Sequence, residues 1–190
     1  MLAGRVARLE PLRAEHLDLL WRAADDPELW RWTASSIHTR DELRAYVESA
    51  LNDAAGGKAL PFVTIACASG AIVGSTRFGN FEAAHARVEI GWTFVAREWQ
   101  RTALNTEAKL LMFRHAFDEL GLERVELKTD ALNANSRAAI RRLGAVEEGT
   151  LRHHMLTDSG RWRDSVYYSV VRAEWPAVRA GLEAKLAAQG

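Results

Sequence analysis

The middle of the chain carries a strand-like alternation of apolar and polar residues. Over residues 87–95 every second position is apolar, which is the pattern of a half-buried strand. One side is predicted to carry Val88, Ile90, Trp92 and Phe94, and the other side Arg87, Glu89, Gly91 and Thr93. The alternation therefore predicts one strand with an apolar face and a face of polar and small residues.

The spacing becomes helical after a short loop. Residues 103–120 have a broad apolar face and a polar stripe formed by Glu107, Arg114 and Asp118. Thr102 is the expected N-cap of this helix, and Gly121 is its expected stop. A strand, a tight loop and a long helix thus follow one another here.

Elsewhere the same rules predict a series of short strands and helices. Strands are expected at residues 4–12, 60–68, 71–81, 124–130, 146–156 and 161–171. Helices are expected at 15–24, 40–54, 135–143 and 174–188. Helical crossovers favour some parallel pairing, whereas hairpins require antiparallel pairing. The sequence therefore predicts an α/β fold, with a mixed, mostly antiparallel, twisted sheet of about seven strands flanked by helices.

The composition narrows the class of protein. A chain of 190 residues that is 48% hydrophobic and 26% charged is typical of one globular domain over residues 1–190. Its 25 basic and 25 acidic residues balance, which gives no reason to expect a nucleic acid or an anionic membrane as partner. The single Cys67 excludes an internal disulfide. Because no signal-like core or membrane-spanning apolar run is present, we expect a cytoplasmic protein.

The start of the helix predicted at residue 103 is the first candidate for chemistry. First-turn amides of a helix lack internal acceptors, and the helix dipole adds positive charge there. Small residues at such a point let phosphate approach closely. Residues 100–106 are mostly small or polar and include Arg101. Spacing alone leaves open both a phosphate-binding turn and an ordinary strand-to-helix turn.

Family patterns favour the phosphate-binding turn. The segment Gln100-Arg101-Thr102-Ala103-Leu104-Asn105-Thr106 resembles the acyl-CoA pyrophosphate loop of the GNAT acyltransferases. It departs from the usual Gln/Arg-x-x-Gly-x-Gly/Ala pattern at both glycine positions. Two further GNAT motifs are resembled by Glu89-Ile90-Gly91-Trp92 and Asn133-Ala134-Asn135-Ser136. Residues 148–152 and 164–167 resemble the closing strands of the RimJ/RimL-type branch, the relatives of the ribosomal-protein N-acetyltransferases.

The resemblance implies how acetyl-CoA, the expected acyl donor, is held. The strands at 87–95 and 124–130 are expected to splay apart, with the cofactor in the opening. Backbone groups of Thr93, Phe94 and Val95 are expected to pair with the pantetheine arm, which Asn133 is also expected to contact. The residues expected around the pyrophosphate are Gln100, Arg101, Thr102, Ala103, Asn105 and Thr106. A helix cap is the alternative role for Asn133, and no metal is expected.

Acyl transfer from a thioester to an amine needs a group that takes the amine's proton. Glu89 is the candidate base, because Gly91 leaves space beside it on the predicted strand face. The alternative is a structural carboxylate that pairs with Arg87 or with an arginine of a neighbouring strand.

The leaving thiolate needs a proton in turn. The resemblance implies Ser136 as a donor near the thioester sulfur, with a cap or packed hydroxyl as the alternative. Tyr167 and Tyr168 are reserve donors, and one of them must face the core because strand neighbours point to opposite sides. His153 and His154 are also strand neighbours, so this pair does not make a metal site by itself.

The expected function is transfer of an acetyl group from acetyl-CoA to a primary amine by direct attack. The acceptor is expected to be a protein N-terminus, a polyamine, an aminoglycoside or another small molecule. Two rivals stay open: a non-catalytic acyl-CoA binder or sensor of the same fold, and a protein-interaction domain without cofactor. Seven tryptophans, together with the resemblance, suggest a homodimer.

Overall fold

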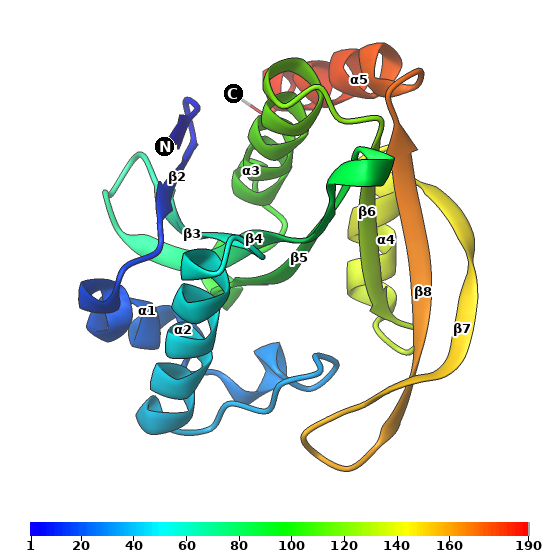
Figure 1. Cartoon of the computed structure of the whole chain (residues 1–190). Coiled ribbons are helices and arrows are strands. Elements are labelled where there is room, and N and C mark those ends of the chain that lie inside the picture. Colours follow the sequence, from blue (N-terminus) through cyan, green and yellow to red (C-terminus); the bar gives the residue numbers. More distant parts are fainter. Residues whose placement is uncertain (190) are drawn as a thin grey trace.

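Eight strands form one sheet in the computed structural model, which describes residues 1–189 (Figure 1). The strands are β1 (Leu2–Ala3), β2 (Ala7–Pro11), β3 (Leu60–Ala66), β4 (Ile72–Glu82), β5 (Arg87–Val95), β6 (Arg124–Asp130), β7 (Val146–Leu156) and β8 (Trp162–Val171). Their order across the sheet is β1-β2-β3-β4-β5-β6-β8-β7. Every neighbouring pair is antiparallel except β5 and β6, which are parallel. The predicted mixed, mostly antiparallel sheet is confirmed, and the eighth strand comes from the N-terminal segment, which forms two strands.

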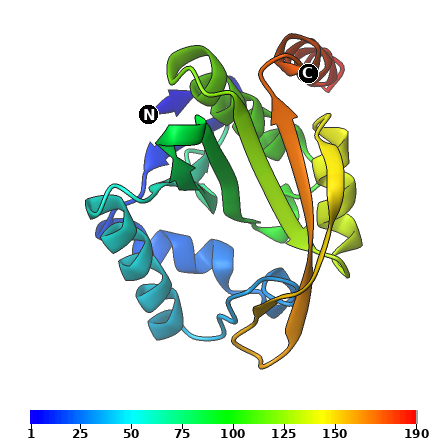
Figure 2. The ribbon, with the colours of Figure 1, turned by 45° about the vertical axis from the view of Figure 1, so that its right-hand side comes forward.

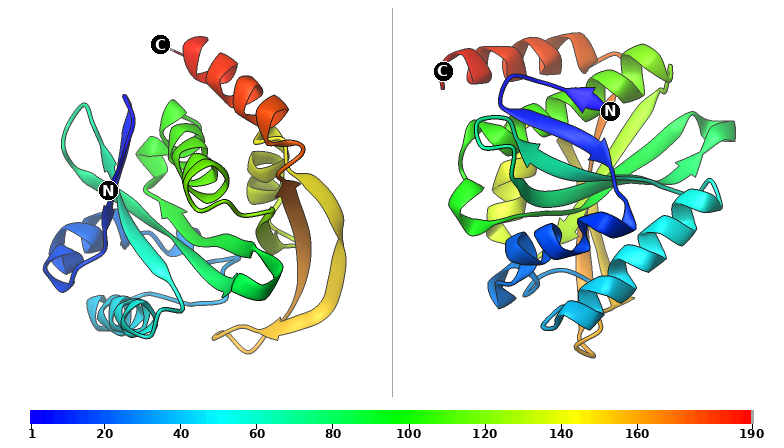
Figure 3. Two further views of the ribbon diagram at one scale, coloured as in Figure 1. Left: turned by 45° about the horizontal axis from the view of Figure 1, so that its top comes forward. Right: turned by 90° about the vertical axis from the view of Figure 1, so that its left-hand side faces the viewer.

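Five α-helices cover the sheet from two sides. They are α1 (Leu17–Ala24), α2 (Arg40–Ala55), α3 (Ala103–Arg114), α4 (Ala134–Arg142) and α5 (Trp175–Ala187). Side chains of α3, α4 and α5 share one core with the sheet, whereas α1 and α2 build a second core. Figure 3 shows α3 on one side of the sheet and α1 and α2 on the other. That second core takes its sheet residues from β3, β4 and β5. Within residues 1–189, no helix is both long and apolar enough to cross a membrane.

Helix α3 is buried around most of its circumference, which differs from the predicted amphipathic helix. It begins as expected at Thr102, whose side chain accepts a hydrogen bond from the Leu104 amide at 3.3 Å. Glu107 does not lie on a solvated stripe. It is 7% exposed and accepts hydrogen bonds from the amides of residues 5, 6 and 7. This carboxylate therefore fastens the N-terminal segment to α3.

The second half of the helix also differs from its prediction. The α-helical part ends at Arg114, and a π-helical turn, His115–Glu119, follows it. Gly121 has a φ of +69°, the left-handed conformation that favours glycine, and it ends the helical segment as predicted.

A β-bulge in β5 overturns part of the predicted alternation. Arg77 of β4 pairs with Gly91, but Ser75 pairs with Phe94, so Trp92 and Thr93 together oppose one residue of β4. Trp92 has a φ of +50° at this point. One extra residue inverts every later side chain. The predictions that Phe94 shares a side with Val88 and Ile90, and that Thr93 shares a side with Glu89, are therefore wrong.

The inverted residues enter different surroundings. Phe94 packs in the core of α1 and α2, with its ring centroid 4.9 Å from that of Trp30. Thr93 turns toward α3, where Lys109 Nζ donates to the hydroxyls of Thr93 and Thr76 at 2.8 Å each. Lys109 is 4% exposed, and burial lowers its pKa to about 7.

The parallel strands β5 and β6 pair only at their beginnings. The paired positions are Arg87 with Arg124, Val88 with Val125 and Glu89 with Glu126. Among the described residues no later pair joins these strands, and Figure 2 shows them diverging. The predicted splay between them is confirmed. It leaves the second half of β5 hydrogen-bonded to β4 on one edge and free on the other.

Candidate active site

Glu89 lies at the last position where β5 pairs with β6. Its side chain is on the side of the sheet opposite Val88 and Ile90, and it is 4% exposed. The carboxylate oxygen Oε2 accepts hydrogen bonds from Asn80 Nδ2 at 2.8 Å and from Lys128 Nζ at 2.7 Å. A buried carboxylate with one oxygen held in this way has a fixed orientation.

The second oxygen of Glu89 is differently placed. No donor of residues 1–189 bonds Oε1, which points toward Gly91; a Cβ at Gly91 would lie only 2.9 Å from it. Glycine thus leaves the space beside Oε1 that the sequence predicted. The expected structural alternative, a pair with an arginine, does not occur, because Arg87 pairs with Glu126 at 3.0 Å and the partner of Glu89 is Lys128.

A line of polar side chains continues from Lys128 across β8 to β7. Lys128 Nζ lies 5.7 Å from the centre of the Tyr167 ring, and the Tyr167 hydroxyl is 3.4 Å from His154 Nε2. His154 Nδ1 lies 3.0 Å from the Ser165 hydroxyl. Burial, and then the positive charges of Lys128 and Arg163, lower the pKa of His154, which favours the neutral form of its ring.

Sequence reasoning named only part of this line. Tyr167 faces the site and Tyr168 is fully buried on the other side, so the prediction that one tyrosine faces the core is confirmed. Lys128 was missed, and His154 was considered only as half of a metal-binding pair. The sequence pattern could have identified Lys128. Alternation along β6 places Glu126, Lys128 and Asp130 on one face, opposite the buried Val125 and Leu127.

The start of α3 lies beyond the free end of β5. Gln100 Nε2 donates to the Val95 carbonyl at 3.0 Å, and this bond holds the turn against the strand. Arg101 is exposed, with a φ of +62°. The Thr102 hydroxyl donates a hydrogen bond to the Trp99 carbonyl and accepts one from the Leu104 amide. By helix geometry the first-turn amides of Ala103 and Asn105 have no intrahelical acceptor, so they remain for an anion.

Thr106 occupies a more enclosed place than the other residues of this segment. Its side chain is 2% exposed, and its hydroxyl accepts a hydrogen bond from Arg142 Nη2 at 3.2 Å. The hydroxyl therefore ties α3 to α4. Arg142, which sequence reasoning missed, brings a positive charge next to the first turn of α3.

The start of α4 lies beyond the end of β6, at the same edge of the sheet as the start of α3, because β5 and β6 are parallel. Asn133 Oδ1 accepts a hydrogen bond from the Ser136 amide at 2.9 Å, so the cap role of Asn133 is confirmed. Ser136 is half-buried, and its hydroxyl makes no hydrogen bond within residues 1–189. Both helix starts thus flank the opening between the strands.

The free edge of β5 completes the arrangement. Phe94 and Val95 pair with Ser75 and Gly74 of β4 on one side and, beyond Glu89, no residue of β6 occupies the other side. An extended ligand can add to such an edge through main-chain hydrogen bonds. The site therefore combines a strand edge, a helix N-terminus and a buried carboxylate.

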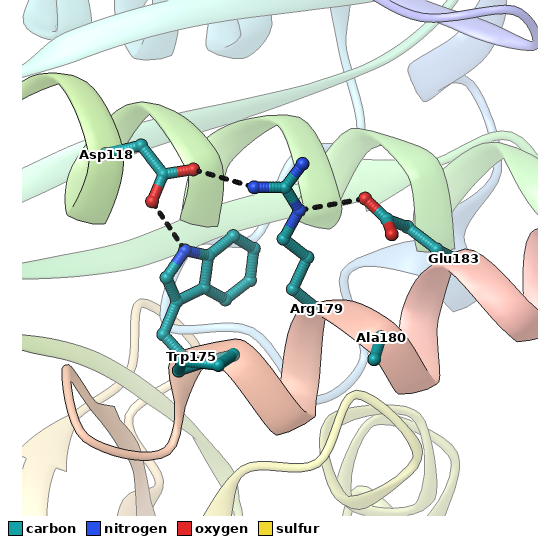
Figure 4. A pocket seen from close by; sticks show the side chains of 6 residues that line it. Asp118, Trp175, Arg179, Ala180 and Glu183 are labelled. Atoms are coloured by element: carbon teal, nitrogen blue, oxygen red, sulfur yellow. Dashed lines mark hydrogen bonds and ion pairs between the residues drawn. The ribbon is translucent and has the colours of Figure 1, made fainter.

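A hollow in the surface lies elsewhere, between the π-helical turn that follows α3 and the start of α5 (Figure 4). Its Trp175 Nε1 donates to Asp118 at 2.7 Å, and Arg179 connects Asp118 with Glu183. Since these polar groups satisfy one another, the hollow is a seam between two helices.

Comparisons with known proteins agree with this geometry. The family described as Acetyltransferase (GNAT) domain matches residues 7–146. A GCN5-related N-acetyltransferase from Brucella melitensis superposes with a TM-score of 0.90 at 33% identity, over 97% of this chain and 84% of that one. RimJ of Mycobacterium smegmatis, in complex with CoA-disulfide, superposes with a TM-score of 0.80 at 27% identity, over 94% of this chain and 88% of that one.

A curated relative points the same way. YdaF of Bacillus subtilis (strain 168), provisionally named a ribosomal N-acetyltransferase, is 33% identical over 106 residues, which are 56% of this chain and 57% of that protein. The match thus spans little more than half of YdaF. The GNAT motif resemblance is confirmed by a family match over most of the chain and by a shared fold. This chain is an N-acetyltransferase that belongs to the GNAT family.

Proposed function

We propose that the protein transfers an acetyl group from acetyl-CoA to a primary amine, and that Glu89 takes the proton of the attacking amine. The observation that carries this proposal is the state of the Glu89 carboxylate at the point where β5 and β6 part. Lys128 and Asn80 hold one oxygen, and the other faces the space that Gly91 leaves. A fixed carboxylate with one available oxygen suits a general base, acting directly or through one water.

The donor fits along the free edge of β5. The pantetheine arm adds to the backbone of Thr93, Phe94 and Val95, and the pyrophosphate meets the first turn of α3 at Ala103 and Asn105. The absence of β6 from this edge supports the first contact, and the unbonded first-turn amides support the second. Gln100 and Thr102 shape the turn, and Arg101 supplies charge.

The leaving thiolate receives its proton from the other side of the opening. Ser136 has a hydroxyl without a partner among the described residues and lies in the first turn of α4, where the helix dipole favours a developing negative charge. Direct attack with these two groups needs no covalent enzyme intermediate and no metal.

The acceptor class follows from relatives only in outline. The name of YdaF describes a ribosomal N-acetyltransferase, and the amine of a protein N-terminus fits the chemistry of Glu89. A single domain over residues 1–190 and a homodimer stay predictions. A light-scattering mass near the 21.2 kDa of one chain would reject the dimer.

The proposal is tested by separating binding from turnover. Acetyl-CoA at millimolar concentration is expected to raise the melting temperature of the protein, because a ligand that binds only the folded state stabilises it. Glu89→Gln keeps the shape of the side chain and is expected to lower kcat by about 10²–10⁴ with nearly unchanged CoA affinity. The defect is expected to shrink as pH approaches the pKa of the acceptor amine.

The matched control is Glu126→Gln, which removes a carboxylate from the neighbouring strand, where it pairs with Arg87 and Arg124. Its turnover is expected to stay within a few-fold of the parent. Equal turnover of Glu89→Gln and the parent, with chemistry limiting, would show that Glu89 is structural. No thermal shift and no binding heat with acetyl-CoA would reject the enzyme proposal itself.

A further inference from the structure

A buried guanidinium on β8 makes no hydrogen bond within residues 1–189. Arg163 is 6% exposed, its Nε is buried and makes no hydrogen bond, and the nearest carboxylate oxygen is Asp130 Oδ2 at 4.0 Å from Nε. Burial lowers the pKa of Arg163, and the negative charges of Asp130 and Glu89 partly offset this shift. Arginine nevertheless stays charged in proteins. A buried charge without a close partner is costly, which calls for a functional reason.

Other arginines show that this state is unusual in the molecule. Buried Nε atoms without a hydrogen bond also occur in Arg8, Arg114 and Arg172. Each of those guanidinium groups nonetheless lies 3.5 Å or less from a carboxylate oxygen. Among the described residues, the carboxylate contact of Arg163 is limited to the 4.0 Å approach to Asp130.

The neighbouring carboxylates are already engaged. Asp130 is fully buried; its Oδ2 pairs closely with Arg161 and its Oδ1 accepts from the Leu132 amide. Glu89 is held by Lys128. This part of the sheet face thus carries the cations Lys128, Arg161 and Arg163 against two carboxylates, an excess of one positive charge.

Arg163 belongs to the same wall as the candidate base. Lys128 pairs with Tyr167 and Asp130 pairs with Ser165, so alternation places Arg163 on the face of β8 that carries Ser165 and Tyr167. Electrostatic effects of Arg163 reach His154, and those of Glu89 reach Arg163. The guanidinium and the Glu89 carboxylate therefore face one region from two strands.

The segment between α1 and α2 bounds this region at the turn between β7 and β8. The Asp158 amide donates to the Ala34 carbonyl at 3.0 Å, and Asp158 Oδ2 accepts from the Ser36 amide at 3.1 Å. Arg161 stacks over Trp32 at 5.5 Å. Figure 2 shows this segment next to the β7–β8 hairpin. The segment therefore lies against the end of the hairpin, two residues from Arg163.

We propose that Arg163 binds an oxyanion, a carboxylate or phosphate, carried by the acceptor whose amine reacts at Glu89. This inference rests on the proposed function, because the amine must lie at Glu89. The planar guanidinium matches the two oxygens of such a group. Binding supplies the missing counter-charge, and it orients the amine toward the base.

The test compares acceptors that differ only in the anion. Acetyl transfer is measured for ω-amino acids from β-alanine to aminohexanoate against their amides, and for phosphoethanolamine against ethanolamine. The parent is expected to favour an anionic acceptor over its neutral match by about tenfold or more in kcat/KM, mainly through KM. Comparing the preference for the ω-amino acids with that for phosphoethanolamine shows whether a carboxylate or a phosphate binds better.

The variants locate the effect. Arg163→Gln is expected to abolish the preference, because it lowers kcat/KM for the anionic acceptors much more than for the neutral ones. Arg163→Lys is expected to retain part of the preference because lysine cannot bind bidentately. Arg152→Gln is the control, since Arg152 is exposed on β7 and has no ion pair among residues 1–189. If Arg163→Gln does not fold, the proposal is tested by whether the parent prefers anionic acceptors over their neutral matches.

The outcomes separate this inference from the proposed function. Good turnover with equal rates on anionic and neutral acceptors would overturn the inference alone. If none of these amines turns over, melting temperatures decide: aminohexanoate or phosphoethanolamine, added with acetyl-CoA, must stabilise the parent more than Arg163→Gln, and equal shifts would overturn the inference. Absence of any acetyl-CoA shift would instead reject the proposed function.

Discussion

One face of the sheet is built in two contrasting halves. Over β3, β4 and β5 it lies beneath α1 and α2, and most of its inward residues are apolar, among them Val63, Ile65 and Phe94. The buried Arg77 of β4 is an exception, packed over the Tyr46 ring of α2. Over β6 and β8 the same face carries Lys128, Asp130 and other polar side chains, and none of its residues belongs to the core of α1 and α2. The boundary is the point where β5 and β6 stop pairing.

The contrast shows that one part of the sheet face stabilises the fold and another part carries the candidate active-site residues. Covered apolar side chains stabilise the fold through the surface that they remove from water. Polar and charged groups are tolerated on the other half where they pair with one another, as Glu89 does with Lys128. Glu89, on the boundary, has neighbours of both kinds. Four changes test this division, in order of decreasing effect.

The largest effect is expected in the covered half. Phe94→Ala removes a ring that is 4% exposed and packs against Trp30, so the free energy of unfolding is expected to fall by about 3–5 kcal/mol. Urea denaturation measures this loss. Phe81→Ala, at a phenylalanine that is 46% exposed, is the matched control and is expected to cost much less. Similar losses at both positions would contradict the division.

Lys109 is the exception on the α3 side, a charge-bearing residue inside a core. Its pKa is about 7 in the folded protein and about 10.4 in an unfolded chain. Between these values the unfolded chain binds more protons, so stability rises with pH and the full penalty is present below pH 7. Lys109→Met is expected to stabilise most at low pH, with a gain that shrinks by up to about 1.4 kcal/mol per pH unit above 7.

Urea denaturation of Lys109→Met and the parent across pH 6 to about 10 measures the Lys109 effect. The exposed Lys58→Met is the control, and its difference from the parent is expected to stay flat. A pH-independent difference for Lys109→Met would show that Lys109 remains charged against Thr76 and Thr93.

A smaller effect is expected at the start of α3. Ala103→Val places a branched side chain where the phosphates approach, so the Kd for CoA is expected to rise by about tenfold, while stability falls by less than about 1 kcal/mol. Calorimetry measures the affinity. Ala45→Val is the control, because it places the same substitution at an exposed position of α2. It carries the same loss of helix propensity but lies outside the proposed CoA site. Unchanged CoA affinity would place the phosphates elsewhere.

The smallest effect is expected at Tyr167 in the uncovered half. Tyr167→Phe removes only the weak contact with His154 at 3.4 Å, so stability is expected to change by less than about 1 kcal/mol. Turnover with a given amine is expected to change by a few-fold, since the ring that packs near Lys128 remains. A loss of stability as large as that of Phe94→Ala would mean that the polar half also supports the fold.

The sequence by itself determined the local features of this protein. Apolar spacing identified the main strands and helices, and hydrogen bonding at Thr102 and the conformation of Gly121 agree with the predicted start and stop of the long helical segment. Glu89 and its neighbour Gly91 were identified from one strand and a motif resemblance. These features depend on residues a few positions apart, so short-range patterns carry them.

The tertiary structure alone decided which distant residues meet. The bulge at Trp92 depends on how β5 aligns with β4, and it turned Phe94 to the opposite side. Lys128 became the partner of Glu89 through the register of β6. Arg163 lacks a close partner because Arg161 already pairs with Asp130. Strand register and charge compensation are properties of neighbouring strands, which a pattern along a single segment does not contain.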